Sequence, residues 1–469
     1  MKRAAWLGSW LVLCLCPAAR ANGRYPIANQ LVVSPGDPAR LVLRTTFGLV
    51  LSEDQGASFR WVCEKAAGFV NNEDPPIEVT ADNSILVASS QALSISHDGG
   101  CAWQQALAEL SVVDADVDQS QPKRAVAIAS LYLDGGTRSG LVQTLDNGQT
   151  WQPLGSDFAG LPATVALAPS APQRIYASGT STEDLTPLIS RSDDNGAHWQ
   201  SYPLTLERVT VPFLAAVDPQ HPDVVYVRAP TATGTDVLLV SRDAGAHFSS
   251  IFKAKGGLYG FALSPDGSQL AVGGPSDPLS VASSADYQFK AVSTLAPLCL
   301  KWSAAGLYAC ADEAKAGFSL GLSTDSGQTF AARFHKPELK LKACPATLDT
   351  GLYCPQAWEG ERALLGIDAG SEPGPDAGTP AAAVDAGLGG SLASAGSSGA
   401  TGGATAASST SGGASARPAQ ASQRGCSMAA AGSRSLPRGV AWAWFAACAA
   451  ICARSAVKRV PRRSRGSPG

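Results

Sequence analysis

The sequence predicts an all-β fold, a seven-bladed β-propeller of four-stranded blades, and three observations lead to this prediction. A short motif recurs at near-constant spacing over most of the chain. Each period between two copies holds about four short runs rich in Val, Leu and Tyr. Pro, Gly and Asp separate these runs, as expected for strands joined by tight turns. Four-stranded units of this length stack radially and leave only short, protected sheet edges.

The recurring motif reads Ser or Thr, any residue, Asp, any residue, Gly, two residues and an aromatic residue. Its clearest copy runs from Thr144 to Trp151. A degenerate copy, from Ala282 to Phe289, divides the last and widest gap between intact copies, so we predict seven periods. The six intact copies place their acidic residues at Asp54, Asp98, Asp146, Asp194, Asp243 and Asp325, with gaps of 44, 48, 48, 49 and 82 residues.

The fifth period shows the expected order of elements. A first strand over 213–217 leads through a Pro-containing turn to a second strand over 224–227, and the third strand, 237–241, enters the motif. We expect the blades to begin near residues 27, 75, 110, 163, 212, 257 and 297. A two-sheet sandwich is the alternative, but it predicts irregular spacing. Residues 335–366 follow the seventh copy and are interpreted as a closing or capping segment.

Composition divides the chain into four parts. Residues 1–21 are expected to be a signal peptide, because Lys2 and Arg3 precede a short apolar run and a small-residue cleavage site. The propeller with its cap takes 22–366. Residues 367–424 are rich in Gly, Ala and Ser and predict a disordered linker. Within 425–469, an apolar stretch before a basic end predicts a short transmembrane helix over about 439–457.

Charge and motif content exclude several classes of partner and chemistry. Residues 22–385 carry 23 basic against 39 acidic side chains, a net of −16, which repels nucleic acids and anionic membrane surfaces. The five His residues are dispersed along the chain without ligand spacing, and no cofactor-binding motif occurs. We therefore expect no nucleic acid partner, no cofactor, no metal and no catalytic residue. The chain is expected to be a monomer.

Six cysteines remain when those of the signal peptide and the C-terminal part are set aside. An exported chain enters an oxidising compartment, so these six are expected to form disulfides. We favour pairing neighbours that bracket a hairpin and the remaining two by elimination. Zinc is the competing interpretation, but no Cys-x-x-Cys supports it. The expected pairs are Cys299–Cys310, Cys344–Cys354 and Cys63–Cys101.

The six intact copies resemble Asp-box, or BNR, repeats, which occur in sialidases, sortilin-type receptors, xyloglucanases and photosystem II assembly factors. The resemblance covers roughly residues 27–334. It implies that the motif joins the third and fourth strands of each blade, that its Asp accepts backbone N–H groups and that its aromatic residue packs between blades. These residues are then structural rather than catalytic, with Gly148, Trp103, Trp151 and Trp199 alongside the six Asp residues.

Residues 425–469 resemble the sorting tag of myxobacterial surface proteins, in which a Cys after Gly precedes a short transmembrane helix and an Arg-rich end. The resemblance implies processing near Cys426, loss of the helix and retention at the cell surface. One feature departs from the pattern, because only a single Cys precedes the helix where such tags often carry neighbouring cysteines.

A sialidase-like site would need three arginines that converge on the propeller axis. A xyloglucanase-like site would need two carboxylates between two propellers, and this chain is expected to have only one propeller. Arg44 and Arg228 lie near expected inner strands, but no third arginine joins them in the sequence. We therefore expect a cell-surface-displayed, non-catalytic binding or scaffold module for an extracellular protein or glycan, attached to the membrane through the C-terminal helix. A carbohydrate-active enzyme is the alternative, and an envelope assembly factor the second alternative, because one fold hosts many functions.

Overall fold

The computed structural model describes residues 24–367, except 70–71, 134–135 and 159. All of these residues belong to one structural unit. The predicted signal peptide, the linker after Ile367, the C-terminal helix and Cys426 lie outside the described residues. Within the described part, no helix combines the length and the apolar character needed to cross a membrane.

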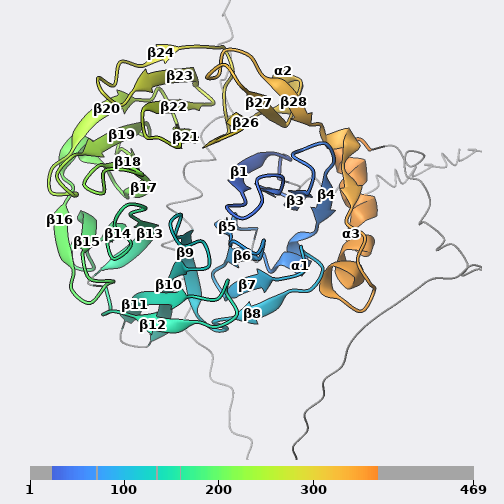
Figure 1. The fold of residues 1–469 in the computed structure, drawn as a ribbon, viewed down its shortest axis with the longest axis horizontal. Helices are drawn as coiled ribbons and strands as arrows, with labels where there is room; N and C mark the ends of the chain where they lie inside the picture. The colour runs from blue at the N-terminus through green and yellow to red at the C-terminus, as the bar shows by residue number, and fades with distance from the viewer. Residues whose placement is uncertain (1–23, 70–71, 134–135, 159, 368–469) are drawn as a thin grey trace, which may run out of the picture. The chain divides into compact units, whose positions relative to one another are not determined.

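The chain forms seven antiparallel sheets arranged around a ring, which confirms the seven-bladed propeller (Figure 1). Each blade takes four consecutive strands, and its first strand lies nearest the centre of the ring. The first strands begin at residues 28, 77, 111, 161, 213, 260 and 299, each within three residues of its expected start. The alternation of short apolar runs and turn residues was therefore sufficient to place every blade.

The strands of the first four blades are as follows. Blade one has β1 Ala28–Val33, β2 Leu41–Thr45, β3 Gly48–Ser52 and β4 Arg60–Val62, and blade two has β5 Ile77–Val79, β6 Ile85–Ala88, β7 Leu93–Ser96 and β8 Gln104–Ala106. Blade three has β9 Ser111–Val117, β10 Ala125–Leu133, β11 Gly136–Thr144 and β12 Gln152–Leu154, and blade four has β13 Leu161–Leu167, β14 Ile175–Thr180, β15 Pro187–Ser192 and β16 Gln200–Pro203.

The remaining blades and the helices complete the described chain. Blade five has β17 Phe213–Val217, β18 Val225–Pro230, β19 Asp236–Ser241 and β20 Ser249–Lys253, and blade six has β21 Gly260–Leu263, β22 Gln269–Gly274, β23 Asp277–Ser283 and β24 Lys290–Ala291. Blade seven has β25 Cys299–Ser303, β26 Gly306–Cys310, β27 Leu320–Ser323 and β28 Ala331–Phe334. Outside the blades lie α1 Glu64–Ala67, η1 Leu206–Arg208, α2 Glu313–Ala316, η2 Lys336–Glu338, β29 Lys340–Leu341 and α3 Asp349–Leu365.

Antiparallel pairing gives the ring two different faces. Successive strands run in opposite directions, so the connections between strands one and two and between strands three and four share one face. We call this the turn face, because it holds the six repeated turns. The connections between strands two and three, and those between consecutive blades, lie on the opposite face, which we call the loop face.

The repeated turns share one hydrogen-bond pattern, which explains why the sequence keeps Ser or Thr, Asp and Gly at fixed spacing. In the turn of blade three, the carboxylate of Asp146 accepts the N–H of Thr150 at 2.9 Å. The hydroxyl of Thr144 donates to Asp146 at 2.7 Å and accepts the N–H of Gly148 at 2.8 Å. The corresponding Asp bond, to the N–H four residues on, is 2.9 Å in each of the other five turns, at Asp54, Asp98, Asp194, Asp243 and Asp325.

Glycine in these turns is required both by backbone conformation and by contact with the preceding blade. Gly148 has φ +89°, and a Cβ placed there would lie 3.2 Å from Leu86 of blade two. Gly327 has φ +91°, and its Cβ would lie 2.7 Å from Leu279 of blade six. In these two turns the backbone packs directly against the preceding blade, where an added side chain would crowd the neighbouring leucine.

The three tryptophans of the repeated turns differ in how their indole N–H groups are used. Trp103 and Trp151 donate to the carbonyls of Gly100 and Gly148, at 3.2 and 3.1 Å. Trp199 packs on Phe158, but its Nε1 is buried without a hydrogen-bond partner. In the turn that carries Trp199, the carbonyl of Gly196 instead accepts hydrogen bonds from the backbone N–H and the hydroxyl of Ser156.

The degenerate copy of the motif occupies the expected place, between the third and fourth strands of blade six. It lacks the glycine, and its side-chain hydrogen bonds join residues only two positions apart, compared with four for the Asp bonds of the other turns. The hydroxyl of Ser283 accepts the N–H of Ala285, and Asp286 accepts the N–H of Gln288. The blade therefore retains its four strands without the full turn pattern.

Replacing Thr144 with valine is expected to lower the free energy of unfolding by about 1–3 kcal/mol, because the buried N–H of Gly148 loses its acceptor. Urea unfolding followed by tryptophan fluorescence measures the change. Thr150→Val in the same turn removes only an exposed side-chain bond to Asp146 and is the matched control, with an expected change within about 0.5 kcal/mol. Equal losses in the two variants would show that the buried bond is unimportant.

The segment after blade seven returns to blade one and ends in a helix. β29 pairs in parallel with β4, where Lys340 lies opposite Arg60 and Leu341 opposite Trp61. The chain then enters the 17-residue helix α3, which packs against α1 at the edge of the ring (Figure 1). Gly351, Pro355 and Gly360 within α3 disfavour a helix, and for this reason the helix was not predicted.

Three disulfides form, and one of the expected pairs is confirmed. Cys299–Cys310 joins the facing ends of β25 and β26. The other two expected pairs, Cys344–Cys354 and Cys63–Cys101, are wrong. Cys354 lies within α3, which packs against α1 beside Cys63, whereas Cys344 precedes the helix and meets Cys101 in the repeated turn of blade two. The observed bonds are Cys63–Cys354 and Cys101–Cys344, with sequence separations of 291 and 243. We call these two bonds the clasp.

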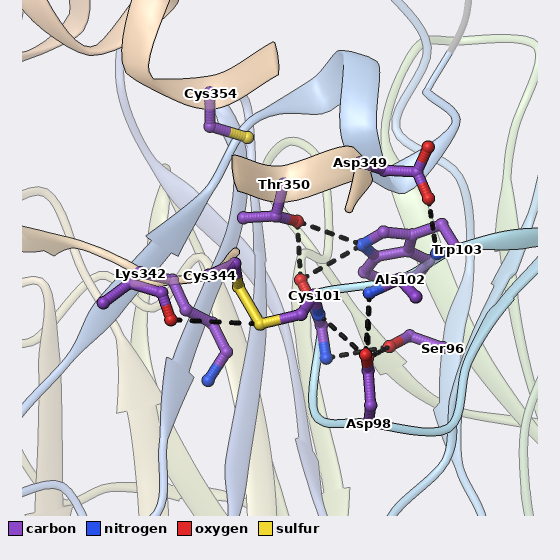
Figure 2. Close-up of a disulfide and its surroundings, with 12 residues drawn as sticks. Ser96, Asp98, Cys101, Ala102, Trp103, Lys342, Cys344, Asp349, Thr350 and Cys354 are labelled. Atoms are coloured by element: carbon purple, nitrogen blue, oxygen red, sulfur yellow. Dashed lines mark hydrogen bonds between the residues drawn. A yellow bond between two sulfur atoms is a disulfide. The ribbon is translucent and has the colours of Figure 1, made fainter. Parts of the chain in front are cut away.

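Hydrogen bonds surround the clasp where α3 meets the repeated turn of blade two (Figure 2). The carboxylate of Asp349 accepts the backbone N–H of Trp103 at 2.8 Å. The buried hydroxyl of Thr350 donates to the carbonyl of Gly100 at 2.6 Å, and the indole of Trp103 lies 3.3 Å from the same hydroxyl. The turn of blade two thus docks α3 as well as shaping its own blade.

Candidate functional site

The six Asp residues of the repeated turns lie in six different blades, so they form no common site. Each carboxylate is used within its own turn. Hydrogen bonds from Thr150, His198 and His247 hold the pKa values of Asp146, Asp194 and Asp243 at about 2. Two of the five histidines, His198 and His247, thus serve the turns. In the described residues, no group of three or more His, Cys, Asp or Glu side chains is placed to hold a metal ion.

Polar side chains on the first strands tie neighbouring blades together around the axis. Asp114 and Asp116 of β9 accept the backbone N–H groups of Val165 and Leu167 of β13, at 2.9 and 2.7 Å. Between other pairs of blades, Gln30 bonds both backbone groups of Ile77, and Thr164 accepts the N–H of Leu214 at 2.8 Å. These side chains satisfy the N–H groups at the free edge of the next blade's first strand.

Three carboxyls near the axis have pKa values raised above their usual ranges. Burial raises the pKa of Asp114 to about 7 and that of Asp116 to about 6. Burial and the nearby charge of Asp116 raise the pKa of Glu78 well above its usual range, against an opposing effect of Lys301. Sequence reasoning missed this group, although the alternation of apolar and acidic residues in Ser111–Val117 is the pattern that could have revealed it.

The two arginines considered from the sequence do not form a site at the axis. The Nη1 of Arg44 donates to the carbonyls of Asp74 and Pro75, at the entrance to blade two. The Nη1 of Arg228 donates to the carbonyl of Leu258, just before blade six. Both guanidinium groups therefore link one blade to the next, and burial lowers the pKa of Arg44 to about 10.

The exposed apolar side chains concentrate on the loop face. Tyr132, Tyr25 and Tyr259 expose 70%, 58% and 52% of their surface. The β10–β11 hairpin, which carries Tyr132, extends beyond the part of β10 that pairs with β9. By the connections that carry them, seven of the ten exposed large apolar side chains belong to this face, namely Tyr25, Leu131, Tyr132, Leu133, Leu185, Leu206 and Tyr259.

An apolar cleft of about 540 Å³ lies between blade six, blade seven and the segment that precedes β1. Phe318 and Phe330 line it, with ring centroids 6.0 Å apart. Tyr25 stands at the cleft with its hydroxyl donating to Asp312 at 2.9 Å. Its volume lies within the range of small-ligand sites.

Comparison with known proteins assigns the chain to no family. No protein-family model and no curated protein matches the chain. Among solved structures, an ancestral GH74 enzyme matches at 12% identity and a TM-score of 0.47, over 66% of this chain and 46% of its own. YCF48 bound to D1 peptide matches at 15% identity and 0.38, over 55% and 80%. The Swd1 propeller domain of Myceliophteria thermophila matches at 11% identity and 0.40, over 61% and 94%.

Proposed function

We propose that this protein is a non-catalytic binding module, exported and displayed at the cell surface, and that its loop face binds an extracellular protein. The observation that carries the proposal is the concentration of exposed tyrosine and leucine side chains on that face. Aromatic side chains are enriched in the cores of protein interfaces.

Other features of the chain support this function. Three disulfides suit an oxidising, extracellular environment. The strongly acidic propeller repels an anionic membrane surface, which makes a protein the better occupant of an apolar face. The inward-facing carboxylates Asp114 and Asp116 hold blades together, so neither is a free catalytic group. Retention at the cell surface through Cys426 and the C-terminal helix is part of the same proposal.

Substituting Tyr132 and Tyr259 together with serine is expected to weaken partner binding at least tenfold, because interface aromatics often contribute more than about 1 kcal/mol each. The measurement compares capture of extracellular proteins by the full-length wild-type chain and by the variant. Leu352→Ser, which removes another exposed apolar side chain, on α3, is the control. A protein retained by wild type and control but lost by the double variant supports the proposal, and equal retention by all three chains contradicts it.

A glycoside hydrolase at the axis is the second candidate, and one observation favours it. Burial raises the pKa of Glu78 well above its usual range, and a raised pKa is what a carboxyl acting as a general acid requires. Release of reducing sugar from polysaccharides by the wild-type chain, abolished by Glu78→Gln, would establish this activity in place of the non-catalytic role.

A further inference from the structure

A second cleft, on the turn face, lies between blades three and four and is separate from the loop-face surface. Its volume is about 730 Å³, within the range of small-ligand sites. The first turns of both blades and the repeated turn of blade four contribute to its walls. The polar side chains that line it are Gln121, Arg124, Gln143, Gln173, Arg174, Asp193 and Asn195.

Arg124 is a fixed part of the wall between the two blades. Its side chain is only 7% exposed, and its Nη1 lies 3.1 Å from the fully buried carboxylate of Asp118. The same Nη1 donates to the carbonyl of Pro172 at 2.6 Å, and Nη2 donates to the side-chain oxygen of Asn195 at 2.9 Å. Three bonds and burial leave this guanidinium little freedom, so it gives the cleft a rigid side.

The second arginine of the cleft is also neutralised by carboxylates. The Nε of Arg174 lies 2.6 Å from Asp193, and its Nη1 contacts Asp223. The other oxygen of Asp193 lies 3.1 Å from the Nε of Arg191. Because every guanidinium here faces a carboxylate, the cleft has no unpaired charge to select an anion or a cation.

Three glutamine amides are the groups left available to a ligand. The side chains of Gln121, Gln143 and Gln173 form no hydrogen bond with any other described residue, although all three line the cleft. An amide both donates and accepts, and so does a hydroxyl group. A phosphate or carboxylate offers acceptors alone and would leave the amide oxygens unpaired.

We propose that this cleft binds a neutral carbohydrate. Its amides complement hydroxyl groups, and the aliphatic side chains of Leu145, Leu154 and Pro172 offer surface to the C–H groups of a sugar ring. The acidic propeller disfavours charged polysaccharides, most of which are anionic. A protein partner is less suited to the cleft, because aromatic side chains are enriched in protein interfaces and none lines it.

The test measures binding of the full-length chain to immobilised neutral glucans, mannans and galactans, with carboxylated and sulfated polysaccharides and a peptide library alongside. The variant with Gln121, Gln143 and Gln173 all changed to alanine is expected to bind the neutral glycan at least tenfold more weakly. Gln220→Ala, an exposed glutamine in the first turn of blade five, is the matched control and keeps wild-type affinity. Because the three amides have no partners in the described protein, the triple variant is expected to fold normally.

Four outcomes would overturn the assignment: no binding of any neutral glycan, binding of acidic polysaccharides or peptides alone, equal binding by the triple variant, or equal weakening by Gln220→Ala. The loop-face variant with Tyr132 and Tyr259 changed to serine is expected to bind the glycan as the wild type does. Failure of the loop-face proposal and failure of this one are therefore distinguishable.

Discussion

Removing both bonds of the clasp, by changing Cys63, Cys101, Cys344 and Cys354 to serine, is expected to lower the free energy of unfolding by about 5–8 kcal/mol. The clasp closes loops with sequence separations of 291 and 243, which include most of the propeller. In the chain-entropy account, closing long loops restricts the unfolded chain most. Urea unfolding of the full-length chain measures the loss.

The two bonds are expected to support each other. With Cys101–Cys344 intact, breaking Cys63–Cys354 releases only the short segments between the two bonds, so either single removal is expected to cost about 2–4 kcal/mol. Loss of both should exceed the sum of the single losses by roughly 1 kcal/mol. The variant lacking Cys299–Cys310, whose separation is 11, is the control and should be destabilised least. A loss as large in this control would show that loop length does not decide the effect.

Stability is expected to be greatest near pH 4–5 and to fall as the pH rises to 8. A carboxyl whose pKa is higher in the folded than in the unfolded chain binds its proton more tightly when folded. Its contribution is therefore present at low pH and is lost as the pH rises through the folded value. Asp114, with a pKa raised by burial to about 7, would alone account for roughly 4 kcal/mol of this loss. Asp116, Glu78 and Glu361 shift in the same direction.

The acid side of the curve has the opposite origin. Hydrogen bonds in the repeated turns lower the pKa values of Asp146 and Asp243 to about 2, so their stabilisation is present above pH 4 and is lost as the pH falls. Urea unfolding at pH 3, 5, 6.5 and 8 measures the free energy of unfolding on both sides of the maximum.

The variant Asp114→Asn tests why stability falls as the pH rises above 5. Its amide oxygen still accepts the N–H of Val165, but the group cannot ionise, so the variant should be more stable than the wild type at pH 8 and less sensitive to pH above 5. Asp157→Asn, outside the axis, changes the net charge equally and is the control. An unchanged slope in Asp114→Asn would contradict the assignment to the axis.

Local chemistry made the blades predictable from the sequence. The bonds of Thr144, Asp146 and Gly148 close within a few residues, so the motif could be recognised from its spacing and the strands placed around it. The Cys299–Cys310 bond was predictable for the same reason, since a hairpin brings the two residues together. The degenerate copy of the motif in blade six was located from the repeat spacing alone.

The candidate sites were much less predictable, because they combine residues from different blades. Arg124 meets Asn195 across a separation of 71 residues, and Asp114 meets Val165 across 51. No periodicity or turn signal reports such pairs. The inner carboxylates left a trace in the alternation of β9, but the cleft between blades three and four left none.

The sequence by itself thus determined the number of blades, their boundaries and the turns that space them, because those features rest on bonds between near neighbours. Only the tertiary structure decided how the ring closes, which cysteines pair and which surfaces are available for binding. In α3, burial of Trp358 against Trp61 and the bond from Cys354 to Cys63 accompany a helix that Gly351 and Pro355 disfavour locally. Contacts between segments nearly 300 residues apart outweighed local preference there.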